Sequence, residues 1–238
     1  MKTIGLLGGM SWESTTSYYQ LINQQVKKQL GGLHSAKIIL NSIDFEPLEI
    51  LQHQGDWEGC ASMLIAAAQN IEAAQADCLL ICTNTMHKVY PQIASSLNLP
   101  VLHIADATAG EIKARGFKTV GLLGTKFTME QDFYKGRLTH DHGIHVIIPV
   151  ASERNLIHRV IYEELCLGEV KDNSRKEFLK IIDNLSSQGA EAIILGCTEI
   201  SLLVKPEDCL TTLLDTTKIH ALAAVKFALL DNKQPLLS

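Results

Sequence analysis

The sequence predicts an α/β fold of two pseudosymmetric half-domains, each a largely parallel sheet flanked by helices. Two observations lead to this prediction. Apolar runs of strand length alternate with longer stretches of helical spacing, and two segments of the first half recur in the second half. Alternation of this kind is typical of βα units, in which each helix carries the chain back to the next parallel strand. The repeat indicates duplication, and we expect the functional site in the cleft between the halves.

The strand-length runs are rich in Val, Ile and Leu, and most are bounded by Gly, Asn, Pro or charged residues. We predict strands at residues 2–7, 37–42, 77–82, 101–104, 119–123, 145–148 and 191–195. Between these runs the apolar residues recur at three- and four-residue spacing, which indicates helices. We predict these helices at residues 14–28, 57–74, 108–114, 156–165, 174–188 and 216–230.

The repeat consists of two pairs of similar segments. Thr3–Gly8 (TIGLLG) recurs as Thr119–Gly124 (TVGLLG), 116 residues later. Ala76–Cys82 (ADCLLIC) recurs as Ala190–Gly196 (AEAIILG), 114 residues later. Two matches in the same order at nearly the same offset indicate two similar halves. The predicted halves are residues 1–98 together with 210–238, and residues 99–209.

The composition excludes several classes of partner. The chain has 238 residues, a net charge of −5 and no stripe of Lys or Arg that would neutralise phosphates, so we expect no nucleic-acid partner. No apolar stretch approaches the ~18 residues that span a bilayer, and the apolar run at the N-terminus is too short for a signal peptide. The six cysteines form no CxxC pair, which favours reduced thiols. We therefore predict a cytoplasmic protein with no membrane partner.

Two polar triplets follow equivalent strands of the repeat. The triplet Thr-Asn-Thr at residues 83–85 falls on Cys-Thr-Glu at residues 197–199, so Thr83 and Cys197 are equivalent and Cys82 belongs to the strand. Such triplets suit the turn into a helix N-terminus, and ligands of open α/β sheets bind beyond the carboxyl ends of the strands. We expect Thr83 and Cys197 to approach one ligand from opposite sides.

Two proton-carrying groups on opposite faces of one carbon are what inversion of a stereocentre requires. One group removes the α-proton while the other delivers a proton to the opposite face. For Cys197 we expect a thiolate, because a helix N-terminus favours negative charge and lowers a thiol pKa. The Thr83 hydroxyl holds its proton more tightly, so the face served by Cys197 should be deprotonated more readily.

Other patterns have simpler interpretations. Gly5–Gly9 lacks the GxGxxG spacing of a dinucleotide loop, so we predict a tight strand-to-helix turn there. Residues 140–145 (HDHGIH) predict a solvated loop rather than a metal site. We expect His87 and His103 to be hydrogen-bonded structural residues, although a role for His87 in the site stays open.

Motifs along essentially the whole chain resemble the aspartate/glutamate racemase family, most closely its bacterial L-aspartate/glutamate-specific members. These motifs are GLLGGMSWEST, CTNTMH, LHIADAT, LLGT with TMEQDFY, EELCLG and LGCTEI. The resemblance implies a cofactor-independent two-base mechanism, a small acidic amino acid as the partner, and a homodimer. The usual catalytic pair of the family is two cysteines. Here Cys197 matches the second cysteine, and Thr83 stands in place of the first, as in the L-specific branch.

The resemblance also implies a set of substrate-binding residues around the catalytic pair. They are Met10, Gln52, Thr83, Asn84, Thr85, Cys166, Cys197, Thr198 and Glu199. For Glu199, binding of a substrate ammonium and support of a helix N-terminus are equally open. The choice between aspartate and glutamate is open as well, and no metal is expected.

Three functions remain at this point. The first is a racemase of acidic amino acids that uses Cys197 and Thr83 as its acid/base pair. The second is a related decarboxylase or isomerase that needs only the Cys197 thiol. The third is a binding protein that keeps the cleft but turns nothing over. Exchange of the substrate α-proton with solvent and release of carbon dioxide would separate the three.

Overall fold

The structure, a computed structural model, describes residues 1–230 and divides into two compact units. Unit 1 comprises Met1–His103 together with the chain from His220, and unit 2 comprises Ile104–Ile219. We predicted boundaries after residues 98 and 209. In the structure both boundaries come later in the chain, because Val101–Leu102 joins the first sheet and Thr212–Asp215 joins the second. Residues 231–238, which the prediction assigned to the first half, lie outside the described residues.

Unit 1 is built on a parallel sheet with the strand order β2-β1-β3-β4. Its elements are β1 (Ile4–Gly8), α1 (Trp12–Leu30), β2 (Ile38–Ser42), α2 (Phe45–Gln54), α3 (Trp57–Ala73), β3 (Cys78–Ile81), the 3-10 helix η1 (Thr85–Val89), α4 (Tyr90–Ser95) and β4 (Val101–Leu102). Helix α10 (Thr216–Leu229) begins in unit 2 and belongs to unit 1 from His220.

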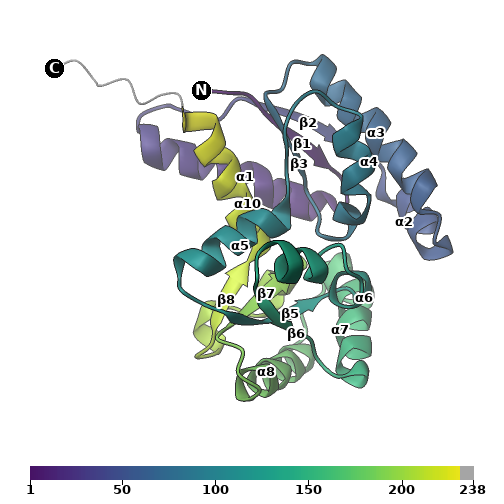
Figure 1. Cartoon of the computed structure of the whole chain (residues 1–238), viewed down its shortest axis with the longest axis vertical. Coiled ribbons are helices and arrows are strands. Elements are labelled where there is room, and N and C mark those ends of the chain that lie inside the picture. Colours follow the sequence, from purple (N-terminus) through teal and green to yellow (C-terminus); the bar gives the residue numbers. More distant parts are fainter. Residues whose placement is uncertain (231–238) are drawn as a thin grey trace. The chain divides into compact units, whose positions relative to one another are not determined.

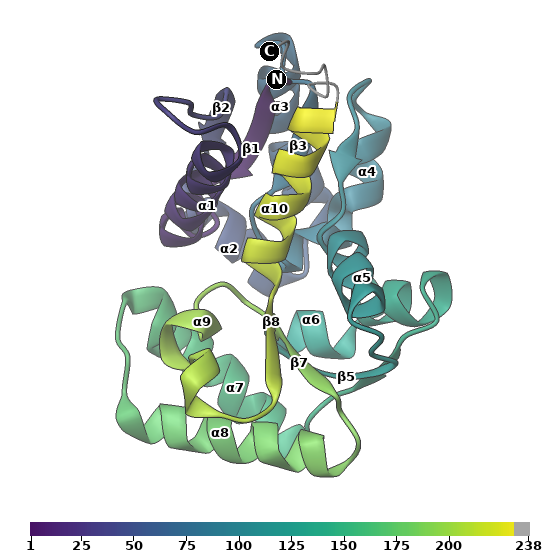
Figure 2. The same ribbon diagram turned by 90° about the vertical axis from the view of Figure 1, so that its left-hand side faces the viewer.

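The two faces of the unit 1 sheet are covered by different helices, because side chains alternate across a strand. Leu80 and Cys82 of the β3 segment pack with residues of α1 and α10. Leu79 and Ile81 of the same segment pack with residues of α3 and α4. Figures 1 and 2 show α1 and α10 on one side of the sheet and α3 on the other. Both faces are buried, which explains the continuous apolar runs of these strands.

Unit 2 repeats the same architecture with the strand order β6-β5-β7-β8, again parallel. Its elements are α5 (Ile104–Ala114), β5 (Thr119–Gly124), α6 (Lys126–Glu130), the π-helical turn η2 (Arg137–Asp141), β6 (His145–Ile147), α7 (Ala151–Glu163), the 3-10 helix η3 (Leu165–Leu167), α8 (Asp172–Ser187), β7 (Ala192–Gly196), α9 (Ile200–Leu203), the 3-10 helix η4 (Pro206–Asp208) and β8 (Thr212–Asp215). Its core joins strand residues to α5, α7 and α8.

The predicted α/β fold of two similar halves is confirmed. The repeated segments form β1 and β5, and β3 and β7, which hold the same positions in sheets of the same order. The sequence prediction missed β8 and the short helices α2, α4 and α6, and it started α7 five residues late.

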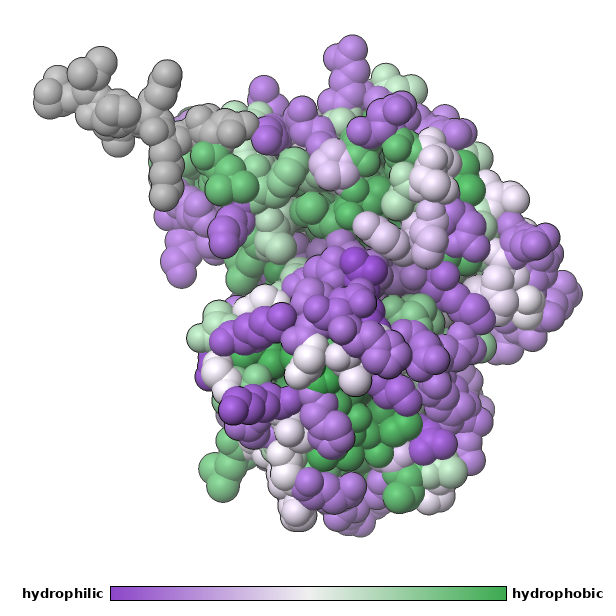
Figure 3. All heavy atoms as spheres, viewed as in Figure 1, coloured by the Kyte–Doolittle hydropathy of each residue, from purple (hydrophilic) through white to green (hydrophobic). Residues whose placement is uncertain are grey.

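The surface combines hydrophilic and hydrophobic side chains. On the face drawn in Figure 3, hydrophilic side chains cover much of each unit and hydrophobic ones appear in separate patches. Within residues 1–230, no helix combines the length and the apolar character that a bilayer crossing needs.

Candidate active site

The first segment of the candidate site is the turn that joins β1 to α1. Gly9 has φ +94°, and a Cβ atom there would clash with the carbonyl oxygen of Ile43. The Thr15 hydroxyl accepts a hydrogen bond from the Gly9 N–H at 2.8 Å and donates one to the Ser11 carbonyl at 2.9 Å. The predicted tight turn is therefore present, and only glycine fits at position 9. It brings Met10, which is buried, to the carboxyl end of the sheet.

Cys82 is a core residue of unit 1. Its side chain is fully buried among residues of α1 and α10. Its N–H donates to the Leu7 carbonyl at 2.9 Å, and its own carbonyl accepts from the Ser14 hydroxyl at 3.1 Å. Burial also raises the pKa of the Cys82 thiol, so this group stays protonated. The thiol is thus a core group, as predicted, although β3 ends at Ile81 and Cys82 lies one residue beyond the strand to which we assigned it.

The predicted triplet at residues 83–85 begins two residues after the end of β3, with Cys82 between them. Thr83 is half-buried, whereas Asn84 and Thr85 are buried. The Thr83 carbonyl accepts a hydrogen bond from Nδ1 of His87 at 2.8 Å. Thr83 is thus the more accessible member of the triplet, as expected for a residue that meets substrate.

Gln52, the other predicted residue of unit 1, lies at the end of α2 and is buried. Met10 shares a core cluster with Leu48 of α2 and Met86 of η1. The segments that carry Met10, Gln52 and Thr83 are therefore packed together within unit 1.

In unit 2 the predicted triplet at residues 197–199 follows β7 and forms a compact hydrogen-bonded group. The Cys197 thiol donates to Oε2 of Glu199 at 2.9 Å, and the Thr198 hydroxyl donates to the same oxygen at 2.9 Å. Glu199 is buried, with 5% of its surface exposed, while Cys197 and Thr198 are half-buried. The Ser201 hydroxyl donates a hydrogen bond to the Thr198 carbonyl at 2.8 Å.

The expectation of a Cys197 thiolate stabilised by a helix N-terminus is wrong for this structure. Burial, the negative charge of Glu199 and the neighbouring Cys166 raise the pKa of Cys197 well above its ordinary value. The helix that follows, α9, has four residues, so its dipole is small. Cys197 is therefore a protonated thiol that is hydrogen-bonded to a carboxylate.

Cys166 belongs to the same part of unit 2. It lies in η3, is half-buried and packs against the unit 2 core together with Cys197. Gly168, at φ +76°, ends this short helix. Cys166 is close enough to Cys197 to raise its pKa, and its role in substrate binding stays a prediction.

A buried histidine cluster next to Thr83 has no motif in the sequence that would have predicted it. The ring of His87 lies 4.5 Å from that of His103 and 5.9 Å from that of His220. Nδ1 of His220 is hydrogen-bonded to the Tyr18 hydroxyl at 2.9 Å. His87 is hydrogen-bonded as predicted, and His103 contacts its ring. His220, which comes from α10, could not be paired with them without the fold.

The HDHGIH segment is partly an ion-pair cluster rather than a free loop. Nε2 of His142 lies 2.8 Å from Asp106, which also binds Arg137 through two hydrogen bonds. These contacts lower the pKa of Asp106 against the opposing effect of burial. Across residues 1–230, no group of three or more His, Cys, Asp or Glu side chains is placed to hold a metal ion.

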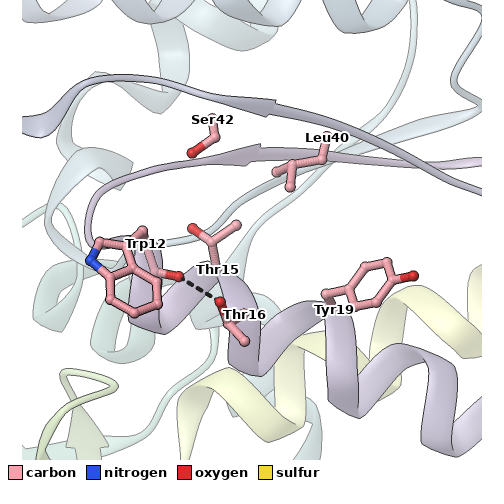
Figure 4. A pocket seen from close by; sticks show the side chains of 6 residues that line it. All are labelled: Trp12, Thr15, Thr16, Tyr19, Leu40 and Ser42. Carbon is pink, nitrogen blue, oxygen red and sulfur yellow. Dashed lines mark hydrogen bonds between the residues drawn. The ribbon is translucent and has the colours of Figure 1, made fainter.

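A separate surface groove lies between α1 and β2. It has a volume of about 350 Å³ and is lined by Trp12, Thr15, Thr16, Tyr19, Leu40 and Ser42. Figure 4 shows the four helix residues facing the two strand residues, with the Thr16 hydroxyl bonded to the Trp12 carbonyl. No thiol, imidazole or carboxylate lines this groove, and none of the predicted site residues does. Its polar lining consists of the hydroxyls of Thr15, Thr16, Tyr19 and Ser42 and the indole of Trp12.

Comparison with known proteins agrees with the resemblance found in the sequence. The family model described as Asp/Glu/Hydantoin racemase matches residues 7–224. A solved Yersinia pestis protein assigned as an Asp/Glu racemase is 55% identical, with a TM-score of 0.91 over 96% of this chain and 100% of that one. A solved aspartate racemase homologue from Pyrococcus horikoshii is 35% identical, with a TM-score of 0.83 over 96% and 99% of the two chains.

A curated relative extends this similarity to a named racemase. The broad specificity amino-acid racemase RacX of Bacillus subtilis is 23% identical over 216 residues, which cover 84% of this chain and 87% of that protein. The family model covers far more than half of the chain, and the fold, the repeated strand ends and the motifs point the same way. The chain belongs to the Asp/Glu/hydantoin racemase family, a family of isomerases.

Proposed function

We propose that the protein interconverts the L- and D-forms of aspartate or glutamate by moving the α-proton directly, without a cofactor. Membership of the racemase family supports the reaction class. Two of its relatives carry the names of an aspartate racemase homologue and an amino-acid racemase. The observation that carries the proposal is the placement of Thr83 and Cys197 within two residues of the carboxyl ends of β3 and β7, the third strands in order of two sheets with the same topology.

The proposed mechanism assigns one face of the α-carbon to each residue. In the L-to-D direction, sulfur of Cys197 takes the α-proton and the Thr83 hydroxyl delivers a proton to the opposite face; the roles reverse for the D-form. A hydroxyl is a far weaker acid than a thiol, so its anion is harder to generate. We therefore expect faster α-proton removal from the L-enantiomer. The equilibrium stays near one to one because mirror images have equal free energies in water.

Substrate binding completes the proposal. We assign it to the residues around the pair: Met10, Gln52, Asn84, Thr85, Cys166, Thr198 and Glu199. Backbone N–H groups at the turns after β3 and β7 are suited to a substrate carboxylate. Cysteines that carry no disulfide among the described residues favour the cytoplasm as the location, and the family resemblance favours a homodimer.

The test is incubation of the purified protein with L- and D-aspartate and with L- and D-glutamate in deuterium oxide. We expect α-deuterium incorporation together with loss of optical rotation, faster from the L-form. Release of carbon dioxide from a malonate-type substrate without racemisation would identify a one-thiol decarboxylase instead. Binding of substrate without any α-exchange would identify a binding protein.

Cys197→Ser connects this activity to the thiol. We expect the variant to fold and to lose turnover by about 10³-fold or more, because a hydroxyl is a far weaker base than a thiolate. Circular dichroism and substrate binding would check the fold. Wild-type-like turnover of a folded Cys197→Ser protein would overturn the assignment.

A further inference from the structure

The contact between Cys197 and Glu199 raises a question about proton transfer. Sulfur can remove an α-proton only as a thiolate. In this structure the Cys197 thiol is protonated and donates a hydrogen bond to Glu199, with 2.9 Å between Sγ and Oε2. Some group must therefore take that hydrogen before the Cys197 face can act as a base. The candidate acceptor has to touch the sulfur and has to be able to carry a proton.

Glu199 satisfies both conditions. Its carboxylate oxygen is the acceptor of the thiol hydrogen, and the Thr198 hydroxyl donates to the same oxygen at 2.9 Å. The second donor fixes the position of this oxygen against the sulfur. With 5% of its surface exposed, Glu199 is shielded from bulk water, so direct transfer from sulfur is the short route.

The internal repeat points to the same residue. The alignment that pairs Thr83 with Cys197 pairs Thr85 with Glu199. The half that carries a thiol therefore has a carboxylate two residues later, and the half that carries a hydroxyl has a second hydroxyl there. At this position of the repeat, a carboxylate therefore accompanies the thiol and none accompanies the Thr83 hydroxyl.

We propose that Glu199 is a catalytic residue that takes the Cys197 proton and so generates the thiolate, an inference that rests on the proposed racemase function. In this step the S–H bond breaks, an O–H bond forms on Oε2, and the negative charge moves from the carboxylate to sulfur. The thiolate then takes the α-proton, and the electron pair of the C–H bond stays on the substrate. Thr83 protonates the opposite face. Glu199 then releases its proton to solvent and the Thr83 oxygen takes one from solvent, which restores both residues with no net gain or loss of protons.

The central test compares two readouts of Glu199→Gln that should move in opposite directions. The first is the rate of Cys197 alkylation by iodoacetamide at neutral pH, followed by mass spectrometry. The second is kcat for α-deuteration of the L-substrate. Removal of the carboxylate charge should raise the alkylation rate by about tenfold, because the thiolate is no longer repelled. The loss of the proton acceptor should lower kcat by about 100-fold.

Two further variants accompany this test. Glu199→Asp keeps a carboxylate on a shorter side chain, and we expect it to recover part of kcat. Glu177→Gln removes an exposed carboxylate of α8 that pairs with Lys180, and neither readout should change.

Three results would overturn the proposal. In the first, kcat and alkylation rise together in Glu199→Gln, which would mean that the carboxylate only holds the thiol in its protonated form. In the second, KM rises at unchanged kcat, which would identify Glu199 as a residue that binds the substrate ammonium. In the third, Glu199→Gln does not fold, and the folded Glu199→Asp protein has the same pH dependence of kcat as the wild type. Absence of α-deuteration in the wild type would instead refute the racemase function, and the alkylation comparison would still test the Cys197–Glu199 contact.

Discussion

Acidification from about pH 7.5 to about pH 5 should destabilise unit 1 through His220. The His220 ring is fully buried, and its Nε2 lies 2.8 Å from the Leu102 carbonyl. A carbonyl only accepts, so Nε2 carries the hydrogen and Nδ1 accepts from the Tyr18 hydroxyl at 2.9 Å. Burial of the charged form lowers the pKa of His220 from 6.5 to about 4.

The size and sign of the effect follow from these two pKa values. Between pH 6.5 and about pH 4 the unfolded chain binds a proton at His220 and the folded chain does not. The contribution of the neutral ring is thus complete above pH 6.5 and is lost as the pH falls through this window. At about pH 5 the loss of unfolding free energy is about 2 kcal/mol. His87 acts in the same direction, because burial and the neighbouring histidines His103 and His220 lower its pKa as well.

The assay can be confined to unit 1, because the two tryptophans of the chain, Trp12 and Trp57, both lie there. Urea unfolding followed by tryptophan fluorescence gives the free energy of unfolding at each pH. His220→Gln should make the loss between the two pH values smaller than in the wild type by about 2 kcal/mol. Tyr18→Phe, which keeps the ring, is the matched control and should retain most of the pH dependence. If the wild type and His220→Gln lost equal free energy, the reasoning would be refuted.

Three other changes test the site. Gly9→Ala should destabilise unit 1 by about 2 kcal/mol or more in urea unfolding, because the position has a positive φ and a Cβ atom would clash with the Ile43 carbonyl. Cys82→Ser should keep kcat within about threefold of the wild type, since the residue is a core thiol; a dead but folded and substrate-binding variant would contradict this. Thr83→Cys should raise α-proton removal from the D-substrate by about tenfold, and an unchanged D-side rate with L-side exchange intact would exclude Thr83 as the limiting group.

The fold was predictable wherever a strand was long and buried on both faces. The segments that became β1, β3, β5 and β7 are the central strands, and their apolar runs gave both the strand predictions and the repeat. The strand β8 was missed because its segment, Thr212–Asp215, has only two apolar residues between polar ones and so shows no apolar run. The half-domain boundaries depended on this strand and on β4, so they were displaced as well.

The strand ends were predictable for a different reason. Alignment of the repeat distinguished Thr83 from its neighbour Cys82 as the residue equivalent to Cys197. The structure shows Cys82 in the core and Thr83 half-buried. The histidine cluster was not predictable, because His87 and His220 are separated by most of the chain and meet only where α10 returns to unit 1. A motif records neighbours in sequence, and this cluster consists of neighbours in space.

For Cys197, a rule based on sequence neighbours predicts the wrong direction of the pKa shift. A thiol before a helix is expected to ionise, but that rule requires a helix of useful length and an open position. Here α9 has four residues, and Glu199 places its negative charge against the sulfur. The pKa of Cys197 is raised as a result. The residue that opposes the thiolate in the resting protein is also the one in position to receive its proton, so the same carboxylate can keep Cys197 unreactive until substrate is bound.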